Sequence, residues 1–213
     1  FCRRICAYCD FFKSAEVGRV DSVLEAMERE LDGAVDWLSD RRIRTVYFGG
    51  GTPSLLPPEE LEEFIAHAAE LFDCTVLEEC TVEANPDDLT PDYLRRLART
   101  RVDRLSIGVQ SFDDGELRLM NRRHTADAAR KAVRQAQEAG FGNVTVDLIF
   151  GVPGFGAATL ARNLRETVAL GVQHVSAYHL TVEPQTAFGR RMAQGRFSPV
   201  TEETSEEEFL TVH

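Results

Sequence analysis

Three cysteines stand close together at the start of the chain, Cys2, Cys6 and Cys9, with the spacing C-x3-C-x2-C. Thiolates are soft ligands that favour iron-sulfur clusters, and a short loop can bring three of them to one centre. Three ligands would hold three irons of a [4Fe-4S] cube and leave the fourth iron without a protein ligand. We therefore expect a cluster whose open iron can bind and reduce another molecule.

Two other interpretations of these cysteines are open. A structural zinc site normally has four Cys or His ligands, and the next candidates along the chain are His67 and Cys74. A disulfide with a spare thiol is typical of oxidising compartments. The chain has five cysteines and no secretory signal, which predicts a reduced, cytoplasmic protein.

A second motif makes the cysteine spacing more specific. Asp10, Phe11 and Phe12 follow the third cysteine, and F-G-G-G-T-P-S occupies residues 48 to 54. Together these residues resemble the radical S-adenosylmethionine (SAM) proteins, and among them the oxygen-independent coproporphyrinogen III oxidase group with its haem-chaperone branch, HemW. The resemblance implies that SAM chelates the open iron and that the reduced cluster cleaves SAM to a 5′-deoxyadenosyl radical.

One position distinguishes the two branches. The oxidase pattern has a further cysteine two positions after the third, and Phe11 stands there in this chain. Phe11 resembles the haem-chaperone branch, whose members are expected to bind haem and deliver it to apo-haemoproteins. The alternative is the oxidase, which decarboxylates the propionates of coproporphyrinogen III to vinyl groups. Both functions imply a reductant for the cluster, with haem or a porphyrinogen as ligand.

The resemblance also assigns residues to SAM binding. Glycines after a strand let a ligand approach the backbone, although such a run is also typical of a simple tight turn. Gly50, Gly51 and Thr52 would contact SAM, and Glu83 would accept hydrogen bonds from its ribose hydroxyls. Tyr8 is the aromatic residue beside the third cysteine. The remaining positions that match the family's SAM site are Gln110, Arg122, Asp147 and Thr181.

Asp147 lies within a run of apolar residues, where a buried carboxylate is costly unless it has a partner. We expect an ion pair with Arg122, which would be structural or would frame the pocket. His124 and His179 could transfer protons, but each is more typical of a structural histidine. Cys74 and Cys80 are expected to be buried thiols.

Strand-like and helical segments alternate along the chain. The strands are expected at 44–48, 80–84, 104–110, 143–150 and 174–180, and an apolar stripe predicts a buried helix over 20–38. This alternation predicts an α/β fold with a parallel sheet, either doubly wound or a barrel. Unusual residues near the strand ends favour a barrel. Ser106, Gly108 and Gln110 should face its lumen, opposite the apolar residues between them.

The resemblance implies a partial (β/α)6 TIM-like barrel, with residues 1–213 as a single radical SAM core domain truncated at both ends. A first strand is expected upstream of Cys2 and a C-terminal domain downstream. The composition, 43% hydrophobic and 28% charged, is ordinary for a soluble protein, and no apolar run is long enough to cross a membrane. The net charge of -11 argues against a nucleic-acid partner. The acidic residues from 202 to 208 are expected in the solvated first turns of a helix.

Overall fold

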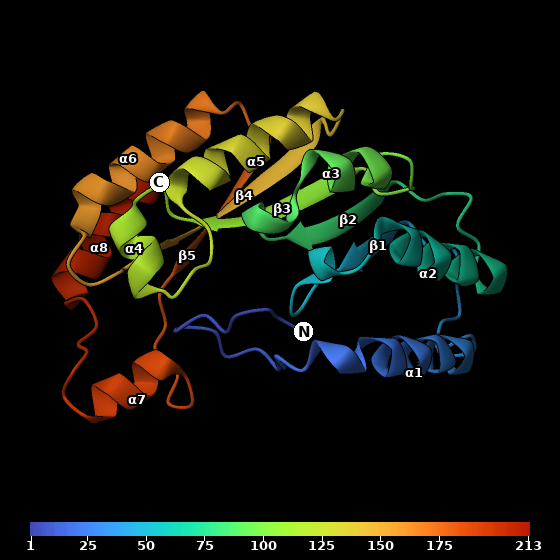
Figure 1. The fold of residues 1–213 in the computed structure, drawn as a ribbon, viewed down its shortest axis with the longest axis horizontal. Coiled ribbons are helices and arrows are strands. Elements are labelled where there is room, and N and C mark those ends of the chain that lie inside the picture. The colour runs from blue at the N-terminus through green and yellow to red at the C-terminus, as the bar shows by residue number, and fades with distance from the viewer.

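The computed structural model describes residues 1–213 and contains one sheet of five parallel strands in the order β1-β2-β3-β4-β5 (Figure 1). A doubly wound sheet reverses its strand order near the middle, whereas a barrel adds each strand on the same side. The sequential order therefore confirms the α/β class and favours the partial barrel. The strands are β1 (Thr45–Phe48), β2 (Glu79–Ala84), β3 (Arg104–Gln110), β4 (Asn143–Phe150) and β5 (His174–His179).

Eight α-helices precede, connect or follow the strands. Threonine N-caps open several of them, among them Thr90 and Thr125, and Gly140 adopts the left-handed backbone (φ +104°) just beyond α5. No helix combines the length and the apolar character that crossing a membrane requires. The helices are α1 (Val20–Gly33), α2 (Pro58–Leu71), α3 (Pro91–Leu97), α4 (Asp114–Leu119), α5 (Ala126–Glu138), α6 (Gly156–Ala169), α7 (Ala187–Ala193) and α8 (Glu202–Val212).

The two faces of the sheet differ in chemistry. On β3, Leu105, Ile107 and Val109 are fully buried and belong to the hydrophobic core under the helices. Ser106 and Gly108 alternate with them and face a cavity on the opposite side. The period of two thus separates an apolar outer face from a polar inner face, as predicted. Figure 1 shows α3, α5 and α6 on one side of the sheet and the N-terminal loop on the other.

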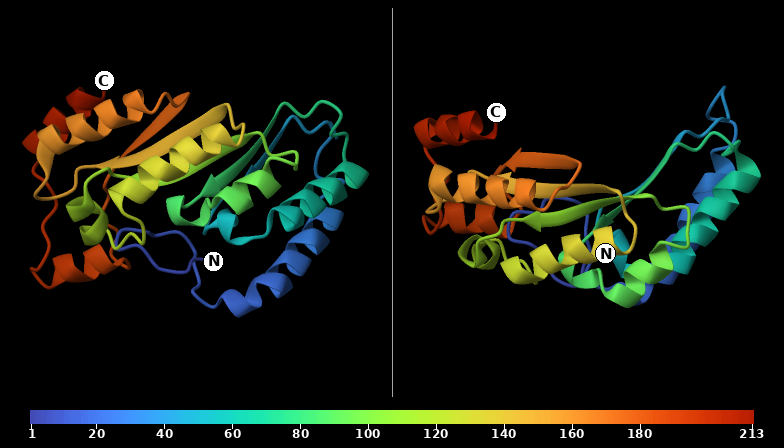
Figure 2. Two further views of the ribbon diagram at one scale, coloured as in Figure 1. Left: turned by 45° about the horizontal axis from the view of Figure 1, so that its top comes forward. Right: turned by 90° about the horizontal axis from the view of Figure 1, so that it is seen from above.

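The first helix is shorter and more exposed than predicted. It ends at Gly33, and none of its residues is buried. Val23 and Met27, expected to be buried, are 39% and 42% exposed. The reason is its position at the margin of the molecule beside α2, where His67 Nε2 lies 2.8 Å from a carboxylate oxygen of Asp32 (Figures 1 and 2). Its apolar stripe has no sheet to cover.

A short helix that sequence analysis missed, α7, supports the N-terminal loop. Phe188 is fully buried, and its ring stacks on Phe197 with centroids 4.3 Å apart. The Phe188 amide donates a hydrogen bond of 2.9 Å to the carbonyl of Ala7, within the cysteine loop. A Cβ on Gly189 would lie 2.2 Å from the carbonyl oxygen of Glu183, so only glycine allows this close approach.

The last helix, α8, begins at Glu202 as expected, but not all of its acidic residues are solvated. Glu208 is 2% exposed, and its Oε2 accepts a 2.6 Å hydrogen bond from the amide of Gly151, just after β4. Because the Glu208 carboxylate accepts a hydrogen bond from the backbone at the end of β4, this polar contact anchors α8 to the sheet at one point. Seen from above, α8 lies at the opposite end of the molecule from α1 and α2 (Figure 2).

We expect Phe188→Ala to lower the free energy of unfolding by about 3–5 kcal/mol, because it opens a cavity beside the cysteine loop. Chemical denaturation of the full-length protein measures this loss. Phe12→Ala is the matched control, since Phe12 is 100% exposed on the same loop and its truncation should cost less than about 0.5 kcal/mol. Equal losses in the two variants would show that α7 does not support the fold.

Candidate functional site

A cavity of about 340 Å³ lies where the C-terminal ends of the strands meet the N-terminal loop. Every residue predicted for the site lines it, although they come from positions far apart in the chain. The structure thus brings together all of the predicted side chains, and it adds Asn85, which the sequence analysis did not assign to the site. The predicted residues are Cys2, Cys6, Tyr8, Cys9, Gly50, Gly51, Thr52, Glu83, Gln110, Arg122, Asp147 and Thr181.

The three cysteines Cys2, Cys6 and Cys9 carry free thiols at the wall of this cavity. No group of three or more His, Cys, Asp or Glu side chains could hold a single metal ion. Ligands of a tetrahedral zinc ion must converge on one point, whereas each cysteine of a cubane binds a separate iron. Thiols spread around a cavity therefore fit a cluster better than a zinc ion.

Main-chain contacts with residues 120–121 fix the cysteine loop. The amide of Ala7 donates to the carbonyl of Met120 at 2.9 Å, and Asn121 Nδ2 donates to the carbonyl of Ile5 at 2.8 Å. Asn121 has a φ of +59°, a left-handed conformation that asparagine tolerates better than most residues. The link from α4 to α5 thus holds the loop on both sides of its second cysteine.

The glycine turn after β1 positions Glu83. Gly50, with a φ of +102°, donates its amide to Glu83 Oε2 at 3.1 Å, and the Tyr47 hydroxyl donates to Oε1 at 2.8 Å. A Cβ on Gly51 would lie 2.4 Å from the backbone nitrogen of Phe1. The second glycine therefore allows the turn, and the third allows the N-terminal segment to pack against it.

A chain of hydrogen bonds links two of the cysteine sulfurs. Thr52 Oγ1 donates to Cys2 Sγ at 3.3 Å and accepts from Asn85 Nδ2 at 3.3 Å. Asn85 Oδ1 accepts from Arg122 Nη2 at 2.6 Å, and Arg122 Nη1 donates to Cys6 Sγ at 3.2 Å. The thiols therefore lie in a connected polar shell.

The predicted ion pair between Arg122 and Asp147 is wrong. Arg122 is bound instead by Asn85 and by the carbonyl of Gly108, which Nη2 reaches at 2.6 Å. Asp147 accepts from Ser106 Oγ, 3.2 and 3.1 Å from its two oxygens. Burial raises the pKa of the Asp147 carboxyl, and the hydrogen bond from Ser106 opposes this shift. Asn85 and Gly108 supply the acceptors for the Arg122 guanidinium. The Asp147 carboxylate therefore has Ser106, on the neighbouring strand β3, as its partner.

Gln110 reaches the cavity through an irregular strand end. The pairing of β3 with β4 shifts register between Ile107 and Gln110, and Gln110 has a φ of +67°. This conformation is uncommon for a residue with a side chain, and bulges near sites often redirect one. A Cβ on Gly108 would lie 2.9 Å from Gln110 Nε2, so the glycine leaves room for the amide.

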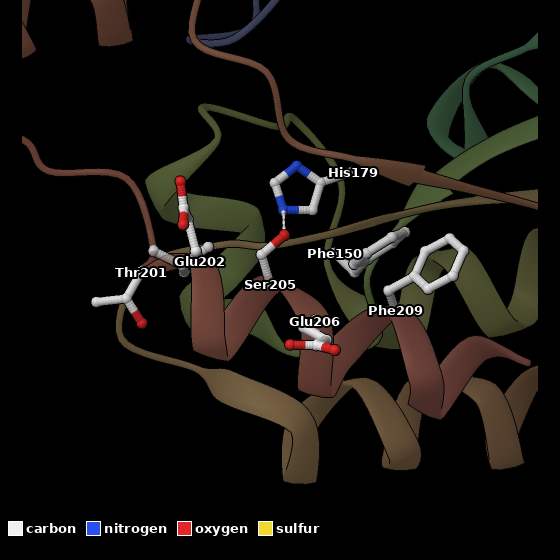
Figure 3. A pocket seen from close by; sticks show the side chains of 8 residues that line it. Phe150, His179, Thr201, Glu202, Ser205, Glu206 and Phe209 are labelled. Carbon is white, nitrogen blue, oxygen red and sulfur yellow. Dashed lines mark hydrogen bonds between the residues drawn. The ribbon is translucent and has the colours of Figure 1, made fainter.

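His179 lies between this cavity and a second one of about 470 Å³ beside α8. Its Nε2 lies 2.8 Å from the hydroxyl of Ser205, and its ring meets Phe150 edge-on with centroids 5.1 Å apart (Figure 3). A Cβ on Gly151 would lie 2.6 Å from Nε2, so that glycine is needed for the imidazole to fit. These three contacts hold the ring in the wall of the site.

His124 does not line the cavity and is 5% exposed. Its Nε2 lies 3.0 Å from the carbonyl of Val109, while Nδ1 has no partner. Burial, together with the positive charge of Arg122, lowers the pKa of His124 to about 4. The histidine is therefore neutral near pH 7 and donates from Nε2 to the strand. This is a structural role.

This depressed pKa predicts a loss of stability on acidification. His124 in the unfolded chain binds a proton as the pH falls below about 6.5, the ordinary pKa of histidine. In the folded chain the pKa of His124 is about 4, so it binds that proton only at lower pH and the folded state loses stability in between. Between pH 7.5 and 5 the protein should lose about 2 kcal/mol more than His124→Gln, which keeps the donor and does not titrate. Urea unfolding at both pH values measures the difference. Identical losses would mean that His124 is protonated as easily in the folded state.

Comparison with known proteins agrees with this geometry. Heme chaperone HemW of Lactococcus lactis is 38% identical over 196 residues, covering 92% of this chain and 51% of that protein. Heme chaperone HemW of Bacillus subtilis is 36% identical over 214 positions, covering 100% of this chain and 56% of that protein. The chain thus spans about half the length of these relatives.

The fold is also that of a solved structure, coproporphyrinogen III oxidase (HemN) from Escherichia coli, a radical SAM enzyme. The TM-score is 0.84 at 24% identity, over 99% of this chain and 49% of that one. Residues 1–180 match the model of the Radical SAM superfamily. Since that match covers most of its length, this chain belongs to the radical SAM superfamily.

Proposed function

We propose that this chain is the radical SAM core of a haem chaperone, in which Cys2, Cys6 and Cys9 hold a [4Fe-4S] cluster. Membership of the superfamily implies both the cluster and SAM. When bound, the cluster supplies single electrons and SAM supplies an electrophilic sulfonium. The donor set supports this assignment, since three thiols line one cavity and leave a corner of the cube free for SAM.

The chain's own residues would orient SAM in the cavity. Glu83, fixed by Tyr47 and Gly50, presents a carboxylate suited to two ribose hydroxyls. Arg122 lines the same cavity, and its guanidinium is held in place by Asn85 and by the carbonyl of Gly108. The other residues that we assign to SAM are Tyr8, Gly50, Gly51, Thr52, Gln110, Asp147 and Thr181.

The choice of the chaperone is carried by Phe11. The side chain is 70% exposed and lines the cavity at the position where the oxidase pattern has a further thiol. An exposed aromatic ring beside the cluster loop offers an apolar contact to a flat ligand such as haem. The relatives named heme chaperones, 38% and 36% identical to this chain, support the same assignment.

The alternative is oxygen-independent coproporphyrinogen III oxidase. The fold is shared with the E. coli enzyme, but the 24% identity supports the fold and not the reaction. The two functions differ in their products. An oxidase converts propionates to vinyl groups, whereas a chaperone returns haem unchanged to an apo-haemoprotein.

A paired assay on the anaerobically purified full-length protein tests this choice. We expect stoichiometric haem binding and transfer to an apo-haemoprotein, with no vinyl product from coproporphyrinogen III under reducing conditions. Decarboxylation without haem transfer would establish the oxidase instead. Phe11→Cys is an informative variant, since it restores the cysteine of the oxidase pattern at the same position.

Loss of any loop cysteine should abolish the cluster. Cys2→Ala, Cys6→Ala and Cys9→Ala should each bind far less iron and sulfide than the wild type and lose the cluster absorbance. Cys74→Ala is the matched control, because Cys74 is a thiol outside the cavity. Cys74 was predicted to be buried, but the structure shows it only partly buried. A cluster that survives any one of the three loop substitutions would contradict the ligand assignment.

Glu83→Gln should weaken SAM binding about 10- to 100-fold, as expected for hydrogen bonds to a charged group. Tyr47→Phe should weaken it less, because the tyrosine acts only through Glu83. Equilibrium dialysis of the reconstituted protein measures both constants. Glu63→Gln, an exposed carboxylate on α2, is the control. Unchanged affinity in Glu83→Gln would remove this residue from the site.

A further inference from the structure

Arg122 is the one arginine whose guanidinium donates a hydrogen bond to a cysteine sulfur of the loop, 3.2 Å from Cys6 Sγ. The same guanidinium is fixed on its other side by Asn85 Oδ1 and by the carbonyl of Gly108, both 2.6 Å from Nη2. Two short hydrogen bonds to one nitrogen leave the side chain little freedom. Its positive charge is therefore held beside the sulfur by groups on the ends of two strands.

The surroundings of Arg122 include a glycine and no paired carboxylate. A Cβ on Gly108 would lie 3.4 Å from Nη2, so a side chain there would crowd the guanidinium. No carboxylate pairs with Arg122, since Asp147 is bound to Ser106 instead. Asp87 acts on the charge of Arg122 from a distance, without an ion pair between them. The cysteine sulfur is the anionic partner that this position offers.

Asn85 connects this arginine to the first cysteine. Its Oδ1 accepts from Arg122, and its Nδ2 donates to Thr52 Oγ1, which in turn donates to Cys2 Sγ at 3.3 Å. One amide side chain therefore positions the donors of two sulfurs. Hydrogen bonds of this second layer orient metal ligands and tune the metal they bind.

Donors at the sulfurs have a defined electronic effect on an iron-sulfur cluster. Hydrogen bonds and positive charge withdraw electron density from the thiolates, and the added electron of the reduced state is stabilised most. The reduction potential rises as a result. A charged donor has a larger effect than a hydroxyl, because charge-assisted hydrogen bonds are about twice as strong as neutral ones.

We propose that Arg122 raises the reduction potential of the cluster through Cys6, and that Asn85 is the residue that positions it. The inference rests on the proposed cluster. It concerns the reduction potential of that cluster and not the binding or transfer of haem. The same residue would couple the cavity to the cluster, because Arg122 lines the cavity and its guanidinium contacts the sulfur.

The test is a redox titration of the reconstituted full-length protein without SAM, followed by electron paramagnetic resonance. Arg122→Gln should shift the midpoint potential to more negative values. Arg122→Lys, which keeps the charge and loses the planar fork, should shift it less. Arg118→Gln removes an equal charge from an exposed position on α4 and should leave the midpoint unchanged.

Asn85→Ala retains the arginine but removes one of the two contacts that fix its guanidinium, so it decides the positioning role. It should shift the midpoint in the same direction, and by less when introduced into Arg122→Gln than into the wild type. An unchanged midpoint in both Arg122→Gln and Asn85→Ala would overturn the inference while leaving the proposed cluster intact. A wild type that assembles no [4Fe-4S] cluster would overturn the proposed function itself. If Arg122→Gln holds no cluster, the Lys and Asn85 variants decide the matter in the same way.

Discussion

The docking of the N-terminal loop against the sheet is the constraint on which the site depends. Three cysteines can share one centre only if the backbone between them is fixed, and the loop has no regular structure of its own between residues 2 and 9. Hydrogen bonds to Met120, to Asn121 and to the amide of Phe188 supply that order from outside. The ligand geometry is therefore a property of α7 and of the α4–α5 link as much as of the cysteines.

The sheet meets a second demand, since it must be apolar toward the helices and polar toward the cavity. Arg104 illustrates how the inner face carries charge, because it hydrogen-bonds Glu79, Thr81 and Thr145 on the neighbouring strands. A half-buried guanidinium with these partners is satisfied without a ligand. The polar residues higher on the strands, such as Glu83, keep oxygen atoms facing the cavity. Polar residues near the start of a strand, such as Arg104, thus stabilise the fold, whereas those near its end, such as Glu83, face the cavity.

Much of this could be predicted from the sequence. The strands follow from β-branched runs with a period of two, and the inward direction of Ser106 and Gly108 follows from the same period. The twelve predicted site residues meet in one cavity because they stand on the inner face of the parallel strands, in the segments that follow the strands, or on the cysteine loop. The family resemblance, and not composition or spacing, gave them their SAM roles.

The rest depends on contacts that no local pattern encodes. The predicted ion pair between Arg122 and Asp147 was wrong because side-chain direction, and not burial alone, decides which acceptor a guanidinium reaches. Asn85 was overlooked because an asparagine before proline is typical of a turn. The exposure of α1 was missed because an amphipathic stripe shows that a face is apolar, and it does not show what covers that face.

The order of the strands leaves β1 and β5 at the two margins of the sheet, each paired on one side only. Their outward amides and carbonyls are templates for any extended peptide, and Tyr47 and Tyr178 stand 55% and 58% exposed beside them. Preparations restricted to residues 1–213 therefore invite self-association through these rims. Concentration, and not only buffer or oxygen, governs whether such samples stay monodisperse.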